Sequence, residues 1–118
     1  MKYLLIVFAL LFSVQTFAGI TTILDVTGSI TNQISTENKV PGLQYSVQCD
    51  ISGTTFDIDI TLQSSVDGSV WTDLGGFTTN FISTDTLLMD VSGGSHFKTR
   101  LNITRNSGTY NLKCKLKN

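Results

Sequence analysis

The sequence predicts an all-β fold, a single antiparallel β-sandwich of about eight strands with a jelly-roll-like arrangement. Four segments alternate apolar and polar residues with a period of two. Short polar breaks, most of them containing glycine, separate these segments. No stretch has a helical stripe of useful length. With 118 residues the chain is long enough for one such domain.

The first eighteen residues predict export. Lys2 precedes an apolar run over residues 3–12, and a short polar segment leads to Ala18. This layout is typical of a secretory signal peptide, and the apolar run is too short for a comfortable membrane span. The alternative is an uncleaved membrane anchor. We expect cleavage after Ala18, a sandwich domain over residues 19–118 without stable membrane insertion, and a periplasmic, cell-surface, extracellular or virion location.

Four segments predict half-buried strands, in chain order residues 43–51, 56–65, 97–103 and 110–117. Weaker strands are expected at residues 20–26, 29–34, 70–74 and 86–91. The expected breaks are residues 27–28, 35–42, 52–55, 67–68, 75–76, 93–94 and 107–108. Strands at the two termini are expected at sheet edges, where they suit lateral packing between copies.

Residues 56–74 predict a β-hairpin that turns at Asp67-Gly68, because this pair accepts the positive φ that tight turns need. Trp71 then starts the return strand. We expect this tryptophan to be in the core or half-buried, although the alternation does not decide which face it occupies.

The two cysteines predict a disulfide. Cys49 and Cys114 both fall on the apolar side of their strands and can meet inside the sandwich. The bridge would close a loop of 65 residues (114 minus 49) and stabilise the fold by about 4 kcal/mol at the upper end. The alternative is a pair of buried free thiols.

Charges of opposite sign are separated along the chain. All nine acidic residues lie between Asp25 and Asp90. The chain has eight basic residues, and one of them, Lys2, lies in the predicted signal peptide. Of the other seven, six follow Asp90. We favour internal complementarity between the C-terminal strand and acidic strands; the alternative is a basic face for phosphate, lipopolysaccharide or an acidic partner. No nucleic-acid partner is expected, because no aromatic residue interleaves the basic ones closely enough to suggest stacking with bases.

No catalytic residue, metal site or cofactor is predicted. His96 is the one histidine and belongs to no recognisable catalytic motif. Two cysteines and a distant histidine are too few ligands for structural zinc. Asp57 and Asp59 share a strand face and, with Asp50 on the neighbouring strand, suggest a calcium site; a solvated acidic face is the favoured interpretation.

The string FDIDITLQSSVDGSVWTDL resembles the QxSxDGxxWxxL hairpin of small phage virion-associated proteins and of some discoidin-like sandwich modules. The similarity extends to LQYSVQCDISGTT before it and FKTRLNITRNSGTYNLKCKLKN after it. Arg100 and Leu101 match an arginine and an apolar residue of that pattern, and Ser107-Gly108 matches its last turn. The resemblance implies a structural or decorating subunit and carries over no catalytic residue. The signal peptide departs from most tailed-phage structural proteins, which leaves an exported bacterial protein or a phage subunit that passes through the membrane.

Three hypotheses for function follow. The third and least favoured is a secreted enzyme or inhibitor, and we expect no enzymatic activity. The first is an exported structural or assembly subunit that associates with itself or with other subunits. The second is a secreted carbohydrate- or surface-binding module that uses Tyr45, Trp71, Phe77 or Phe81 as aromatic platforms for a surface glycan. Phe77 and Phe81 lie in an expected polar loop, residues 75–86. Exposure of both rings would favour binding, and burial in the core would favour assembly.

Overall fold

The computed structural model describes residues 19–39, 44–92 and 98–117. The predicted signal peptide and His96 lie outside these ranges. The described chain forms nine strands and no helix, so it contains no helix that could span a membrane. The strands are β1 (Ile20–Ser29), β2 (Gln33–Ile34), β3 (Asn38–Lys39), β4 (Gln44–Ser52), β5 (Phe56–Ser65), β6 (Thr72–Phe81), β7 (Asp85–Ser92), β8 (Lys98–Gly108) and β9 (Tyr110–Lys117).

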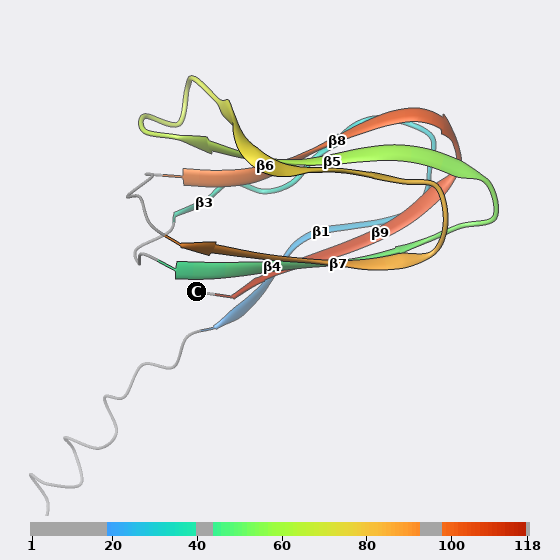
Figure 1. Cartoon of the computed structure of the whole chain (residues 1–118), viewed down its shortest axis with the longest axis horizontal. Coiled ribbons are helices and arrows are strands. Elements are labelled where there is room, and N and C mark those ends of the chain that lie inside the picture. The colour runs from blue at the N-terminus through green and yellow to red at the C-terminus, as the bar shows by residue number, and fades with distance from the viewer. Residues whose placement is uncertain (1–18, 40–43, 93–97, 118) are drawn as a thin grey trace, which may run out of the picture.

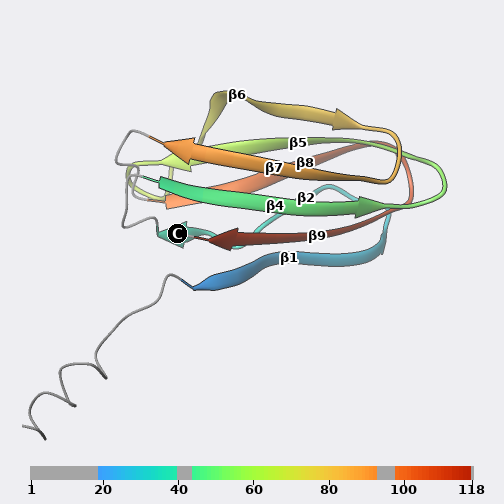
Figure 2. The same ribbon diagram turned by 60° about the horizontal axis from the view of Figure 1, so that its bottom comes forward.

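The strands form two antiparallel sheets that pack face to face (Figures 1 and 2). Sheet A has the order β1-β9-β4-β7, and sheet B has the order β2-β8-β5-β6, with β3 also paired to β8. This confirms the predicted all-β sandwich, and the strand order is that of a jelly roll. One expectation is wrong: β9, the C-terminal strand, lies in the middle of sheet A rather than at its edge.

The core consists of the inward-facing side chains of both sheets, as period-two alternation requires. Its fully buried aliphatic members include Ile58, Ile60, Leu62, Leu101, Ile103 and Leu112. Polar groups inside the sandwich are paired. The Tyr45 hydroxyl lies 3.3 Å from Thr99 Oγ1, which joins β4 of sheet A to β8 of sheet B. The Tyr110 hydroxyl donates to the Thr31 carbonyl at 2.7 Å.

The expected break at Gly75-Gly76 is wrong, and so is the loop at residues 75–86. Strand β6 continues through both glycines to Phe81, and β7 begins at Asp85. The pairing of β5 with β6 shifts register here: Gln63 pairs with Asp73, whereas Thr61 pairs with Thr78. A bulge in β6 therefore absorbs the extra residues, because pairing with β5 resumes beyond them.

The expected break at Thr27-Gly28 is also wrong, since β1 runs through it to Ser29 with two register shifts against β9. The predicted strand at residues 29–34 is not continuous: Ser29 ends β1 and pairs with Tyr110, and Gln33–Ile34 form the separate strand β2. In contrast, β5 and β9 have the predicted bounds.

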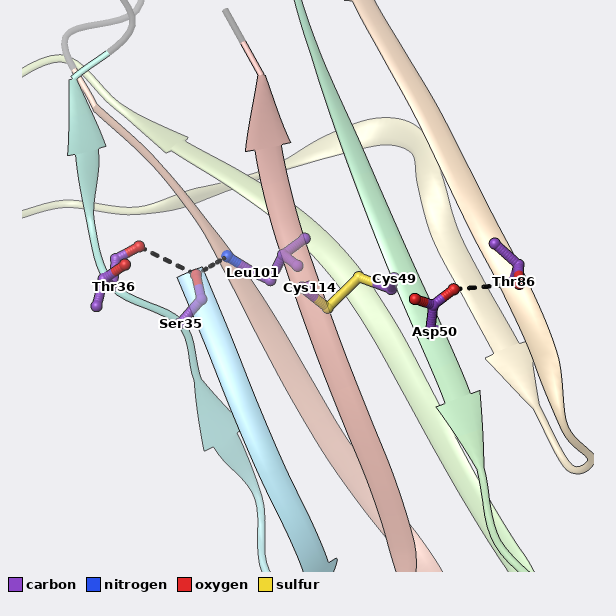
Figure 3. Close-up of a disulfide and its surroundings, with 7 residues drawn as sticks. All are labelled: Ser35, Thr36, Cys49, Asp50, Thr86, Leu101 and Cys114. Atoms are coloured by element: carbon purple, nitrogen blue, oxygen red, sulfur yellow. Dashed lines mark hydrogen bonds between the residues drawn. A yellow bond between two sulfur atoms is a disulfide. The ribbon is translucent and has the colours of Figure 1, made fainter. Parts of the chain in front are cut away.

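The predicted disulfide is confirmed: Cys49 and Cys114 are bonded to each other (Figure 3). They lie directly opposite one another on β4 and β9, both fully buried. The bridge therefore joins the two central strands of sheet A, which carry the edge strands β7 and β1 on their other sides.

The two long sides of the sandwich differ. On the side of β1 and β2, which we call the closed side, Ser35 exchanges hydrogen bonds with Leu101 of sheet B. The next residue, Thr36, donates its N–H to the Ile23 carbonyl of sheet A at 3.0 Å. On the opposite side, which we call the open side, β6 pairs only with β5 and β7 only with β4 among the described residues.

Candidate functional site

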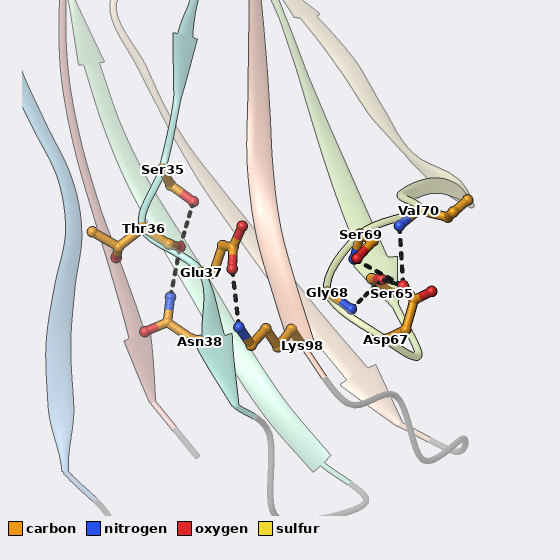
Figure 4. A network of polar contacts seen from close by, with 10 residues as sticks. All are labelled: Ser35, Thr36, Glu37, Asn38, Ser65, Asp67, Gly68, Ser69, Val70 and Lys98. Atoms are coloured by element: carbon orange, nitrogen blue, oxygen red, sulfur yellow. Dashed lines mark hydrogen bonds and ion pairs between the residues drawn. The ribbon is translucent and has the colours of Figure 1, made fainter.

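The β5–β6 turn is fixed by the side chain of Asp67 (Figure 4). Its Oδ1 accepts hydrogen bonds from the N–H groups of Ser69 at 2.8 Å and Val70 at 3.0 Å. The Ser65 hydroxyl also donates to this atom and accepts from the Gly68 N–H. The bonds from Val70 and Ser69 lower the pKa of Asp67 below its usual value. This turn sets the position of the residue that follows Val70, the one tryptophan of the chain.

That residue, Trp71, is half-buried and lies against the outer face of sheet B. The guanidinium carbon of Arg100 lies 4.1 Å from the centre of its ring, a cation–π contact. Arg100 Nε donates to Gln63 Oε1 at 2.9 Å, and Gln63 Nε2 donates to Asp73 Oδ1 at 2.8 Å. We call Gln63, Trp71, Asp73 and Arg100 the arginine cluster. It spans β8, β5 and the start of β6.

A second polar cluster lies on β5, β6 and β8 of the same sheet. Asn80 donates at 2.7 Å to both Asp57 and Asp59, and Asn106 donates to both carboxylates at 3.1 Å. The bonds from Asn80 and Asn106 lower the pKa of Asp57. Asp50 is not beside them, because β4 belongs to sheet A and β5 to sheet B. The described residues contain no group of three or more His, Cys, Asp or Glu side chains that could hold a metal ion.

The four aromatic residues considered as binding platforms occupy different positions. Tyr45 and Phe81 are only 6% and 7% exposed and belong to the core. Phe77 is half-buried and packs against the core. Phe81 lies in the core and Phe77 is half-buried, so the two rings do not form an exposed pair. Trp71 is the one of the four that lies on an outer face in contact with Arg100.

Sequence reasoning missed the arginine cluster as a site. Arg100 and Gln63 stood out only through a resemblance that assigned them no role, and Asp73 carried no signal. The three residues share one row across the sheet, because Gln63 pairs with Arg100 on one side and with Asp73 on the other. That row depends on strand register, which alternation alone does not give.

The basic C-terminal strand lies beside acidic residues at one position. Lys113 pairs in register with Asp25 of β1 and Asp50 of β4, which is the predicted internal complementarity. The next two outward lysines of β9 have uncharged partners. Lys115 faces Thr22 and Gln48, and Lys117 faces Ile20 and Ser46.

Comparison with known proteins supports the fold. No protein-family model matches the sequence, and no curated protein sequence matches it. Among solved structures, the SPBc2 prophage-derived protein YomS aligns with a TM-score of 0.58 at 17% identity, over 89% of this chain and 98% of its own. The PBSX exported protein XepA aligns with a TM-score of 0.62 at 10% identity, over 84% of this chain but 36% of its own length. A subunit of Bacillus endospore appendages, described as disulfide-linked pili, aligns with a TM-score of 0.50 at 13% identity, over 86% of this chain and 88% of its own. At these identities the likeness shows the shared β-sandwich fold.

Proposed function

We propose that this protein is an exported, non-enzymatic β-sandwich subunit that assembles with copies of itself in a virion-like or other extracellular structure. The observation that carries the proposal is strand β7, an edge strand on the open side that pairs with β4 alone among the described residues. In the described part of the chain no second strand pairs with β7, so its outer backbone groups provide a template on which a strand of another copy can pair, although the Thr86 N–H already donates to Asp85 Oδ1.

Strand β7 has the regularity that strand addition needs. It pairs with β4 residue for residue, from Asp85 opposite Ile51 to Ser92 opposite Gln44, without a register shift. Its sequence, DTLLMDVS, contains no proline, lysine or arginine. Leu88 on its outward face is 61% exposed. Proteins that avoid edge-to-edge pairing usually place a bulge, a lysine or a proline on such a strand.

The other edges carry features that disfavour pairing. Strands β2 and β3 have two residues each. Strand β1 has two register shifts and receives the Thr36 N–H at Ile23. The register of β6 shifts between Thr61 and Gln63 of β5. Strand β7 is therefore the long regular edge in the described part of the chain.

Export and an extracellular role are consistent with the disulfide and with the structural neighbours. Disulfides persist in oxidising compartments. One neighbour is an exported protein and another forms disulfide-linked pili. This sequence has two cysteines, and both form the internal bridge Cys49–Cys114. Assembly of this chain would therefore be non-covalent. The alternative, a glycan-binding module built on aromatic platforms, has less support because two of the four rings lie in the core.

The test expresses the full-length chain and measures the assembly state of the exported protein. The intact mass of that exported protein also tests the expected start at Gly19. We expect light scattering after size-exclusion chromatography to show a dimer or larger species. Leu88→Lys places a charge on the outward face of β7, and we expect it to weaken assembly by about tenfold or more in the dissociation constant.

The matched control is Val66→Lys, which adds the same charge at a residue that is 79% exposed in the β5–β6 turn. We expect it to leave assembly unchanged. A wild-type protein that is monomeric at every concentration would overturn the proposal. Equal weakening by the two substitutions would assign the effect to net charge and would remove β7 as the interface.

A further inference from the structure

The guanidinium group of Arg100 is held in place on an open protein surface. The ring of Trp71 lies against its face at 4.1 Å, and its Nε donates to Gln63 Oε1. Gln63 is itself oriented, because its amide nitrogen donates to Asp73. Two neighbours thus fix both the plane and the rotation of the guanidinium group. Its two terminal nitrogens have no hydrogen-bond acceptor among the described residues.

This arrangement is suited to a planar oxyanion. A guanidinium group donates two parallel hydrogen bonds to a carboxylate, and these are among the stronger hydrogen bonds in proteins. An arginine on a surface normally loses side-chain freedom when it binds. Here the stacking and the Nε bond already restrict that freedom, so less is lost when a ligand binds.

The surroundings of Arg100 favour a sugar as the carrier of that carboxylate. The adjacent row of the sheet holds Ile34, Asn102, Thr61 and Thr78, of which Ile34 is exposed and Thr61 is buried. Among the described residues, the side chains of Asn102 and Thr78 make no hydrogen bond to protein, so they are available to hydroxyl groups. Protein interfaces usually have an apolar, well-packed centre, whereas three of the four residues in this row are polar. Sugars instead combine hydroxyl groups with an apolar ring face, which suits amides and hydroxyls beside an indole.

We propose that the arginine cluster on sheet B binds an acidic polysaccharide, with a uronate carboxylate on the Arg100 fork and sugar hydroxyls on the neighbouring polar row. This activity goes beyond assembly and uses a different surface, because β7 belongs to sheet A. A monomeric Leu88→Lys protein should therefore bind the sugar as the wild type does.

The experiment titrates the folded, oxidised protein with trigalacturonate and, in parallel, with its fully methyl-esterified counterpart. Trp71 is the single tryptophan of the chain, so its fluorescence reports on the proposed site directly. Calorimetry provides a second readout that does not depend on the ring. We expect saturable binding of the acid form with a dissociation constant on the order of 1 mM, and at least about tenfold weaker binding of the ester.

Three variants locate the binding. Arg100→Lys keeps the charge and removes the fork, and we expect about tenfold weaker binding. Gln63→Met removes the partner of Nε together with the donor to Asp73 and keeps the guanidinium group, and we expect a smaller loss in the same direction. Lys113→Gln removes a positive charge from the outer face of sheet A and should leave binding unchanged. Circular dichroism checks that each variant is folded.

Several results would overturn the proposal. One is the absence of both heat and a fluorescence change at saturating trigalacturonate. Equal binding of the acid and the ester would show that the carboxylate takes no part in binding. Full affinity in both Arg100→Lys and Gln63→Met would exclude the arginine cluster as the binding site. Tighter binding of inorganic phosphate than of trigalacturonate would assign the fork to phosphate and overturn the uronate.

Discussion

The closed side and the open side of the sandwich both contain strand edges, and the fold treats these edges differently. On the closed side, Ser35 bonds to β8 of sheet B and Thr36 bonds to β1 of sheet A, so one short segment joins both sheets. On the open side, β7 presents a regular edge that pairs with β4 alone among the described residues. Edge strands without protection are where other chains can pair. Among the described residues, one side of this fold is bridged between its two sheets, whereas the other leaves a regular strand edge, which is the edge that we propose for assembly.

Removal of the disulfide is expected to have the largest effect. The Cys49→Ala/Cys114→Ala double variant should lower the free energy of unfolding by about 4 kcal/mol at most, because the bridge closes a loop of 65 residues. Urea unfolding measures the loss. The bridge joins β4 and β9, which carry the open edge and the closed edge respectively. Hydrogen exchange should therefore accelerate more in β7 than in β1, since Thr36 still holds β1. Faster exchange in β1 than in β7 would contradict the distinction between the two sides.

The second prediction compares one serine from each side. Ser35 is 5% exposed, and its hydroxyl accepts the buried Leu101 N–H at 2.8 Å. Ser35→Ala leaves this N–H without its partner, and we expect a loss of about 2 kcal/mol. The matched change on the open side is Ser46→Ala, which removes a solvent-accessible bond from the Ser46 hydroxyl to Asp90 on β7. Its loss should stay within about 0.5 kcal/mol.

Thermal and urea unfolding of the two serine variants provide the measurement. Assembly adds a second readout. If the hydrogen bonds of Ser35 prevent another chain from pairing at the closed side, Ser35→Ala should also create new association that Leu88→Lys does not suppress. Equal losses of stability in the two variants would show that the Ser35 hydrogen bond contributes no more than the solvent-accessible bond of Ser46.

Period-two alternation was sufficient to predict the strands with a continuous apolar face. Strands β5 and β9 have the predicted bounds, and the inward positions of Cys49 and Cys114 predicted their bridge. Alternation failed where pairing overrides local preference. Gly75-Gly76 carries a turn signal, yet β6 continues through it because β5 offers pairing partners on both sides of the bulge.

The arginine cluster could not be predicted from the sequence for a related reason. Trp71 and Arg100 are brought together by the order β8-β5-β6 and by the register of Gln63 with both neighbouring strands. The hydrogen bonds of the closed side could not be predicted from the sequence for the same reason. Ser35 lies in a segment without alternation, and its role depends on the position of Leu101 across the sheet. Local patterns identify strands, but not which strands become neighbours.

The smallest expected effect concerns the ion pair of the closed side. Lys98 and Glu37 lie 3.1 Å apart, with side chains that are 27% and 40% exposed (Figure 4). Partly exposed pairs contribute little, so Glu37→Gln should cost less than about 1 kcal/mol. Salt screens this interaction, and the difference from wild type should disappear at about 1 M sodium chloride. Urea unfolding at low and high salt measures both values.

Asp90→Asn is the matched control on the open side, because it removes a carboxylate that accepts a bond from the neutral Ser46 hydroxyl. Its effect should be small and nearly independent of salt. A salt-independent loss above about 1.5 kcal/mol for Glu37→Gln would exceed the range of exposed pairs. The closed side would then depend on this charge pair, and the contribution assigned to the Ser35 and Thr36 hydrogen bonds would have to be reduced.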